Sequence, residues 1–156
     1  MDDIKVSFPG GRRVDAVIGG HLVHTDQPAS AGGTDSAPGP FDLFLGSLAT
    51  CAGFYVLALC SARGIPTDGL SVVQHHRVDP ESHRLLGVTL EVVVPPGFPE
   101  RYRDAVVRAA SSCKVKKLLA QPPEIDVVIK ASGAPAVDAG DAGAAPRPAA
   151  LQSTSP

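Results

Sequence analysis

Apolar and polar residues alternate along the first part of the chain. Residues 4–8 (IKVSF) show a period of two, which is typical of half-buried β-strands, and residues 14–18 (VDAVI) and 21–25 (HLVHT) are predicted as the second and third strands. The segments between them, PGG at 9–11 and GG at 19–20, are short enough for tight turns. The pattern therefore predicts an antiparallel meander of three strands.

A long loop and a long uncharged segment follow this meander. Residues 26–39 are rich in Gly, Pro and Ser, and loops of this length are often functional. Residues 43–62 (LFLGSLATCAGFYVLALCSA) carry no charge, and a glycine and a proline just beyond them end the helical pattern. Since proline suits the first position of a helix, we expect one helix from Pro40 to about Ala62, buried on nearly all sides.

The second half of the chain repeats the change from strands to a helix. Residues 70–79 (LSVVQHHRVD) and 84–94 (RLLGVTLEVVV) predict two long strands of a second hairpin. A second helix is expected from Phe98 to the prolines after residue 121, with a break conceivable at Ser111–Ser112. Residues 124–130 (EIDVVIK) predict a final strand. The order β-β-β-α-β-β-α-β indicates an antiparallel α+β domain.

Composition indicates where this domain ends and which class of partner is excluded. Residues 1–131 are long enough for one packed domain, whereas residues 132–156 consist mainly of Ala, Gly, Pro and Ser and are predicted to be a disordered tail. A net charge of -2, no Trp and only two Tyr argue against a nucleic-acid partner. The acidic N-terminus lacks the apolar core of a secretory signal, so we expect a cytoplasmic protein.

The uncharged segment is long enough to span a bilayer, so the alternative to a core helix is a membrane helix. Its first half is rich in small residues, and the flanking segments alternate like strands of a soluble protein. A central helix of a compact fold or dimer is therefore preferred, with no membrane partner.

Three cysteines, Cys51, Cys60 and Cys113, are the candidates for chemistry. They are too few for a disulfide scaffold. Cys51 and Cys60 lie on roughly opposite faces of one helix, so they cannot pair, and Cys60 is interpreted as a packing residue. If a helix restarts near Cys113, Ser112 is a plausible N-cap, and the helix dipole and three nearby lysines would favour a thiolate at Cys113. The alternative is a cysteine without a role.

Cys51 lies about eleven residues into its own helix, too far from the N-terminus for the dipole to act on it. We therefore expect that a reactive Cys51 needs a cation from elsewhere. Arg12 and Arg13, at the first hairpin turn, are the leading candidates, with Arg63 and Arg77 as alternatives. For each of the four, the alternative is an arginine that is simply solvated.

Other chemistry finds little support in the sequence. No CxxC, HxxxH or comparable cluster of metal ligands occurs, and the adjacent His75 and His76 would point to opposite faces of a strand. No GxSxG, GxGxxG or GxxxxGK motif occurs either. We expect neither a metal nor a bound cofactor.

Two segments, PFDLFLGSLATCAGFYVLAL and SSCKVKKLL, together resemble the OsmC/Ohr family. The shared pattern is a proline eleven residues before the first cysteine, a helix of small residues through it, and a later Cys-x-Val, here Pro40, Cys51 and Cys113. The resemblance covers most of residues 4–130. It implies the OsmC/Ohr-like fold, with antiparallel strand layers around a central helix, and an intertwined homodimer.

The resemblance also implies thiol-dependent reduction of organic hydroperoxides. It implies that Cys51 is the peroxidatic cysteine and Cys113 the resolving one, and that an arginine of the first hairpin, best matched by Arg12, holds the thiolate. The family's glutamate that holds this arginine is replaced by Phe41, and the nearest acid is Asp42. The chain departs from the family again at Lys114, where a proline is usual.

The resemblance leads to a concrete reaction with open alternatives. The Cys51 thiolate would attack the peroxide, and Cys113 would form a disulfide that an external dithiol, lipoyl-type or small, reduces. An apolar pocket for the substrate is expected from five residues of the central helix: Phe41, Phe44, Leu48, Phe54 and Tyr55. The alternatives are an OsmC-like thiol protein without peroxidase activity and a module that binds a hydrophobic ligand.

Overall fold

A computed structural model of the chain describes residues 2–131. The chain divides into two compact units, residues 1–123 and 124–156. The tail predicted at 132–156 lies outside the described residues, and so the domain boundary predicted at residue 131 stays a prediction. All the helices and strands that follow belong to the first unit.

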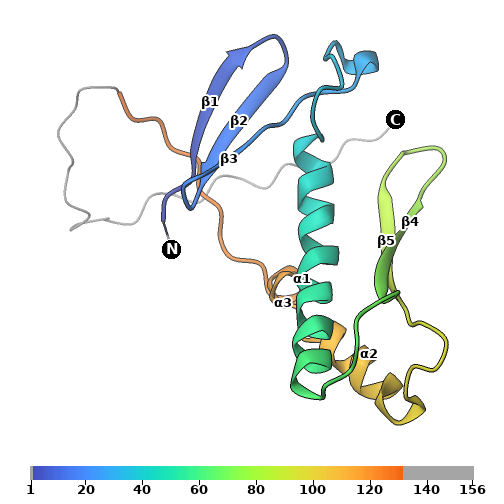
Figure 1. Ribbon diagram of the computed structural model, residues 1–156. Coiled ribbons are helices and arrows are strands. Elements are labelled where there is room, and N and C mark those ends of the chain that lie inside the picture. Colours follow the sequence, from blue (N-terminus) through green and yellow to red (C-terminus); the bar gives the residue numbers. More distant parts are fainter. Residues whose placement is uncertain (1, 132–156) are drawn as a thin grey trace. The chain divides into compact units, whose positions relative to one another are not determined.

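The N-terminal sheet contains three antiparallel strands in the order β1-β2-β3 (Figure 1). They are β1 (Lys5–Gly10), β2 (Arg13–Ile18) and β3 (His21–Val23). Gly19 and Gly20 connect the last two strands with φ values of 55° and 82°. Two successive positive φ values are typical of the tight turn that matches the twist of a hairpin. The predicted meander is confirmed.

Both faces of this sheet leave large apolar side chains exposed. In residues 2–131, the main cluster of buried hydrophobic residues takes no member from β1, β2 or β3. The exposed apolar residues of the sheet and its N-terminal edge are Ile4, Val6, Phe8, Val17, Ile18 and Leu22. The predicted strands therefore form, but in the described part of one chain no second layer buries their apolar side chains.

The loop after the sheet is folded around one carboxylate. Asp26 Oδ2 accepts hydrogen bonds from the backbone N–H and hydroxyl of Thr34 (3.0 and 2.6 Å) and of Ser36 (3.1 and 2.8 Å), and Oδ1 accepts one from Gln27 N–H at 2.8 Å. Asp26 is buried, and these bonds, with the Thr34 hydroxyl as the largest cause, hold its pKa well below the usual range. The loop is thus an ordered link to the helix that follows.

The central helix α1 (Pro40–Ala62) has the bounds that the sequence predicts. Pro40 occupies its first position, and the Asp42 carboxylate accepts a hydrogen bond from Gly39 N–H at 3.1 Å. Asp42 therefore caps the start of its own helix. The helix ends at Arg63, before Gly64, whose φ of 63° favours glycine.

The second hairpin consists of β4 (Ser71–Val78) and β5 (Leu85–Val93), which pair antiparallel with Val72 opposite Val92. Alternate side chains of β5, from Val88 to Val92, are half-buried and pack against the core. The hairpin lies beside α1 in Figure 1, and α1 and β4 are in contact. This part of the prediction is confirmed.

The second helical region is broken into three pieces: a 3-10 turn (Glu100–Tyr102), α2 (Arg103–Ser111) and α3 (Lys114–Ala120). The helix predicted to begin at Phe98 therefore begins later, and the break near Ser111–Ser112 is confirmed. Ser112 N–H bonds to Ala109 O at 2.9 Å, which closes α2 with a tight turn.

The core of the first unit lies between α1, α2 and the second hairpin. A single cluster of buried side chains connects them. Its members are Leu48, Ala52, Val56, Cys60, Ile65, Phe98, Val106, Ala110 and Cys113. Two of the three cysteines are thus core residues, and the fold is α+β with antiparallel sheets, as predicted.

The strand predicted at 124–130 is wrong for the chain as described. Residues 122–131 contain neither helix nor strand, and Val127 and Ile129 are 93% and 101% exposed. A strand exists only where its backbone groups pair with a neighbour. Within residues 124–131 no such neighbour is available, so the alternating pattern alone does not produce a strand.

Candidate active site

Cys51 lies on α1 at the boundary between the buried stripe of the helix and its exposed face. The buried residues of the helix follow the spacing expected of one helical face: Leu45, Leu48, Ala52, Val56 and Cys60. Cys51 is half-buried and packs against the core, whereas Thr50 and Phe54 are exposed. The thiol is therefore in contact with the interior without being sealed in it.

Cys113 is the N-cap residue of α3 and is fully buried. Its Sγ accepts a hydrogen bond from Lys116 N–H at 3.5 Å and donates one to Leu48 O, on α1, at 3.8 Å. The prediction that Ser112 is the N-cap and Cys113 a residue of the first turn is wrong by one position, because Ser112 closes α2. The cysteine itself takes the capping role.

The two thiols are brought together, and their surroundings shift their pKa values in opposite directions. The backbone N–H of Val115 is the largest cause that lowers the pKa of Cys51, and it outweighs burial; the Cys113 thiol and the N–H and charge of Lys114 act in the same direction. Burial raises the pKa of Cys113. Of the two thiols, Cys51 is thus the one whose thiolate the surroundings favour.

The first backbone amides of α3 and the charge of Lys114 lower the pKa of Cys51 within one chain, and the sequence-based prediction included neither group for this thiol. That prediction concerned only the dipole of the helix that carries Cys51, whereas in the fold a different helix, α3, starts beside the thiol. Likewise, the expectation that the start of α3 favours a thiolate at Cys113 is wrong, since burial dominates there. The Ser-Ser-Cys break was the available signal for this helix start.

The arginines of the first hairpin have other partners. Arg13 forms an ion pair with the buried carboxylate of Asp15 at 2.9 Å, and Asp15 also bonds to Nδ1 of His24 at 2.7 Å. Arg12 lies against the loop, so that a Cβ atom on Gly32 would come within 3.4 Å of its Nε. Within residues 2–131 of one chain, no hydrogen bond or ion pair links either arginine to Cys51 or Asp42.

The five residues predicted to form a substrate pocket do not converge in one chain. Phe41 and Phe44 stack with ring centroids 5.8 Å apart, and Phe54 and Tyr55 meet edge to face at 5.7 Å. The three phenylalanines are exposed, and only Leu48 is buried. The aromatic residues instead give α1 an apolar outer face.

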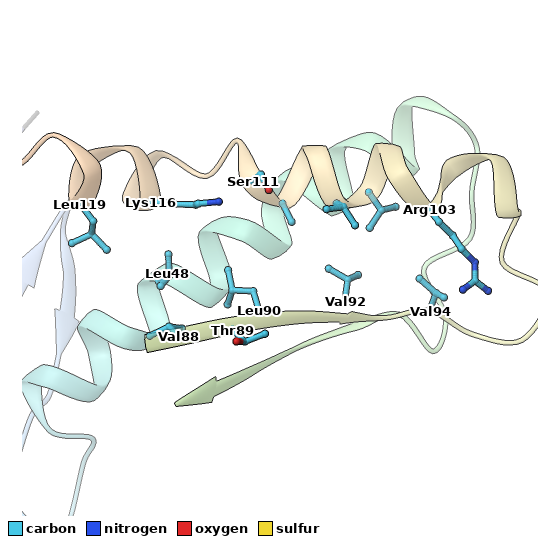
Figure 2. Close-up of a pocket in the computed structure, with 13 residues that line it drawn as sticks. Leu48, Val88, Thr89, Leu90, Val92, Val94, Arg103, Ser111, Lys116 and Leu119 are labelled. Carbon is cyan, nitrogen blue, oxygen red and sulfur yellow. The ribbon is translucent and has the colours of Figure 1, made fainter. Parts of the chain in front are cut away.

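A cavity of about 550 Å³ lies between β5, α2, α3 and α1 (Figure 2). Of the five predicted pocket residues, only Leu48 lines it. The remaining apolar lining is missing from the prediction: Val88, Leu90, Val92, Val94, Val106, Val107, Ala110 and Leu119. The alternation of residues 84–94 indicated an inward-facing side of this strand, but not the helix that faces it.

Metal chemistry has no visible basis in the described part of the chain. Within residues 2–131, no group of three or more His, Cys, Asp or Glu side chains is placed to hold a metal ion. The three cysteines are free thiols. The Cys51 and Cys113 thiols are the nucleophilic side chains described above for this site.

Comparison with known proteins shows the family of this chain. The family described as OsmC-like protein matches residues 33–128, more than half of the chain. The chain belongs to the OsmC-like protein family. A comparison with curated proteins gives no significant match.

Several solved structures have folds similar to that of this OsmC-like chain. The structure of a putative osmotic stress induced and detoxification response protein from Psychrobacter arcticus 273-4 is similar with a TM-score of 0.64 and 22% identity, over 75% of this chain and 87% of that one. An OsmC like protein from Mycoplasma pneumoniae has a TM-score of 0.59 and 16% identity, over 77% and 87%.

A third similar structure is that of an organic hydroperoxide resistance protein OsmC, also described as a predicted redox protein, from Legionella pneumophila. It has a TM-score of 0.50 and 22% identity, over 75% of this chain and 87% of that one. At these identities the three structures establish the fold.

The family also settles how the long apolar helix is interpreted. By length and composition alone, α1 could cross a membrane, and it is the one such helix in residues 2–131. In the OsmC-like fold its buried stripe packs on α2, α3 and β4. The prediction of a central core helix, rather than a membrane helix, agrees with this packing.

Proposed function

We propose that this OsmC-like chain is a thiol peroxidase that reduces organic hydroperoxides to alcohols. The observation that carries the proposal is the pairing of a half-buried Cys51, whose pKa is lowered, with a buried Cys113, whose pKa is raised. A peroxidatic cysteine must be a thiolate, whereas its resolving partner needs only to be within reach. The name of the Legionella pneumophila protein, an organic hydroperoxide resistance protein, supports the same reaction.

The reaction balances with these two residues and an external dithiol. The Cys51 thiolate attacks one oxygen of the O–O bond, the alkoxide leaves and takes up a proton as the alcohol, and Cys51 becomes a sulfenic acid. The Cys113 thiol then attacks the sulfenic sulfur and displaces water, which forms the Cys51–Cys113 disulfide. An external dithiol, lipoyl-type or small, reduces the disulfide and is itself oxidised. No metal or bound cofactor takes part.

The direct test measures consumption of cumene hydroperoxide with dihydrolipoamide or dithiothreitol as the reductant. We expect Cys51→Ser to abolish turnover. Cys113→Ser should keep the first step and accumulate a sulfenic acid that dimedone traps. Cys60→Ser is the matched control, because Cys60 is a buried thiol whose pKa burial raises and which faces no partner thiol among the described residues. Inactivity of the wild-type chain with both reductants would contradict the proposal.

The second candidate is an OsmC-like thiol protein that reacts with electrophiles other than peroxides. It is favoured by the arginines, which in one chain contact Asp15 and the loop rather than Cys51. Iodoacetamide and cumene hydroperoxide should be compared at the same pH. Fast alkylation of Cys51 with slow oxidation would favour this candidate over the peroxidase.

We also propose that the chain works as a cytoplasmic homodimer. The outer face of α1, with Phe44, Phe54 and Leu57, is apolar and exposed, and a helix that is apolar all round is normally buried. The N-terminal sheet likewise lacks a covering layer. A second copy would cover both surfaces, and sedimentation equilibrium that gives a monomer at micromolar concentration would contradict this proposal.

In such a dimer, Arg12 would serve the thiol of the other subunit, because its sheet shares no core with Cys51 in one chain. A mixing experiment separates this arrangement from one within a single subunit. Arg12→Ala and Cys51→Ser chains, each poorly active alone, should form mixed dimers with one intact site and regain about a quarter of the wild-type activity. No gain on mixing would place the arginine in the same subunit as its thiol, or away from it.

A further inference from the structure

The cavity between β5 and α2 adjoins the thiol pair, because Leu48 and Lys116 line it and each bonds to Cys113 through its backbone. Neither Cys51 nor Cys113 lines it. Its floor is the inward-facing side of β5, where Val88, Leu90, Val92 and Val94 follow one another along the strand, and α2 forms the opposite wall (Figure 2). The extended segment from Val88 to Val94, which runs one residue past the end of β5, covers six residue steps and corresponds to a length of roughly 20 Å. A volume of about 550 Å³ lies within the range of small-ligand sites.

The polar groups of this groove are few and unevenly placed. Arg103 lies at the end near Val94, and its charge is offset by an ion pair with Glu100 at 2.6 Å. Lys116 lies at the other end and forms no ion pair with any residue from 2 to 131. Its side chain runs along the groove with the ammonium group directed toward Ser111, whose hydroxyl also faces the groove (Figure 2).

An elongated apolar floor with one uncompensated cation selects a particular kind of ligand. A neutral alkane would leave Lys116 without a partner, and a polyanion would find only one free cation and an apolar wall. A straight-chain monoanion satisfies both features, because its chain removes the valines from water while its head group meets the ammonium and the hydroxyl.

From this charge complementarity, we propose that the groove binds a linear aliphatic carboxylate, with the carboxylate at Lys116 and Ser111 and the chain along Leu90, Val92 and Val106. This ligand is bound without reacting. The site therefore does not depend on the peroxidase activity and would be present in a chain whose thiols are removed.

The test uses the full chain and isothermal titration with decanoate, decanol and decyltrimethylammonium. We expect saturable binding of decanoate, one per chain, weaker binding of decanol and none of the cation. Lys116→Glu should weaken decanoate binding by about tenfold or more and leave decanol unchanged. Lys117→Glu is the matched control, because it changes the same charge on the same helix and does not line the groove; its affinity should stay at the wild-type value.

A second variant protects the test against effects on folding. Val107 is 62% exposed and lines the groove, so Val107→Glu should fold normally and repel decanoate. Absence of saturable decanoate binding, or equal losses in Lys116→Glu and Lys117→Glu, would overturn the proposal. So would a Val107→Glu chain that changes its mass in solution but keeps its affinity, because the groove would then be an interface between copies. Cys51→Ser should bind decanoate normally, which separates this site from the proposed peroxidase.

Discussion

The N-terminal sheet and the part of the chain built around α1 differ in how they are stabilised. The helical part encloses a continuous core that joins α1 and α2 to the second hairpin. The sheet has antiparallel pairing, with one register shift between Ser7 and Gly10, yet leaves residues such as Phe8 and Leu22 exposed. Both regions follow the apolar patterns of their sequences, but only one finds within the same chain the surface that its pattern requires.

This comparison shows that backbone hydrogen bonding and the burial of apolar side chains are separate requirements for a stable sheet. The strands of a three-stranded sheet pair with one another through their backbones, whereas the hydrophobic contribution needs a second layer. The apolar residues of the sheet and the outer face of α1 remain exposed in one chain, and the proposed dimer would cover them. The same reasoning explains why the first hairpin, with its two arginines, does not reach the thiols in a single chain.

The largest expected effect is on stability, and it comes from replacing a valine by aspartate once in the core and once in the sheet. Val56 is 1% exposed in the core, and Val17 is 43% exposed on the sheet. Val56→Asp buries an unpaired carboxylate and should lower the free energy of unfolding by about 4 kcal/mol or more, whereas Val17→Asp should lower it far less. Urea denaturation of both variants under conditions where the chain is monomeric is the measurement. Equal losses would mean that the sheet has its own buried core.

A smaller effect is expected on association. Phe8 is 80% exposed, and burying it against a second copy would contribute about 1.5–3 kcal/mol. Phe8→Lys should therefore weaken dimerisation by at least about tenfold in sedimentation equilibrium. Ser30→Lys, which adds the same charge at an exposed loop position, is the control. An unchanged dimer constant for Phe8→Lys would leave the sheet uncovered in solution.

A pH-dependent effect distinguishes the sheet from the core, since the sheet holds a buried carboxylate. Burial tends to raise the pKa of Asp15, but the hydrogen bond from His24 and the charge of Arg13 outweigh it, so that the pKa lies below its usual 3.8. The stability from Asp15 is therefore fully present above about pH 4 and is lost as the pH falls through the lower, folded value.

Asp15→Asn should accordingly be less stable than the wild-type chain at pH 7, with the difference shrinking below about pH 4. Urea midpoints measured from pH 2 to pH 7 test this expectation. A difference that stays constant with pH would assign the loss to packing rather than to the charge.

The smallest effect concerns the loop that connects the two regions. Ser36→Ala removes one of the hydroxyl donors to Asp26 and leaves the backbone donors in place. We expect the Thr34 amide to exchange roughly fivefold faster, with no change in global unfolding. Hydrogen exchange followed by NMR is the measurement, and Ser30→Ala, in the same loop, is the control. Unaltered exchange at Thr34 would show that the backbone donors alone hold the loop.

Local chemistry made much of this protein predictable from its sequence. The alternating segments, the paired glycines and Pro40 with the glycine after Ala62 determine the hairpins and the bounds of α1, because each acts over a few neighbouring residues. The uncharged helix and the later Cys-x-Val were also enough to predict the family that the comparison shows.

Only the tertiary structure decided which groups surround each thiol. Asp42 caps α1, and the amides at the start of α3 lie beside Cys51 although more than sixty residues separate them in the chain. The segment at 124–130 has the pattern of a strand but forms none in the described part of the chain. Periodicity indicates which side chains are buried. The partner of a strand edge or of a thiolate depends instead on contacts between distant parts of the chain, and no local pattern encodes these contacts.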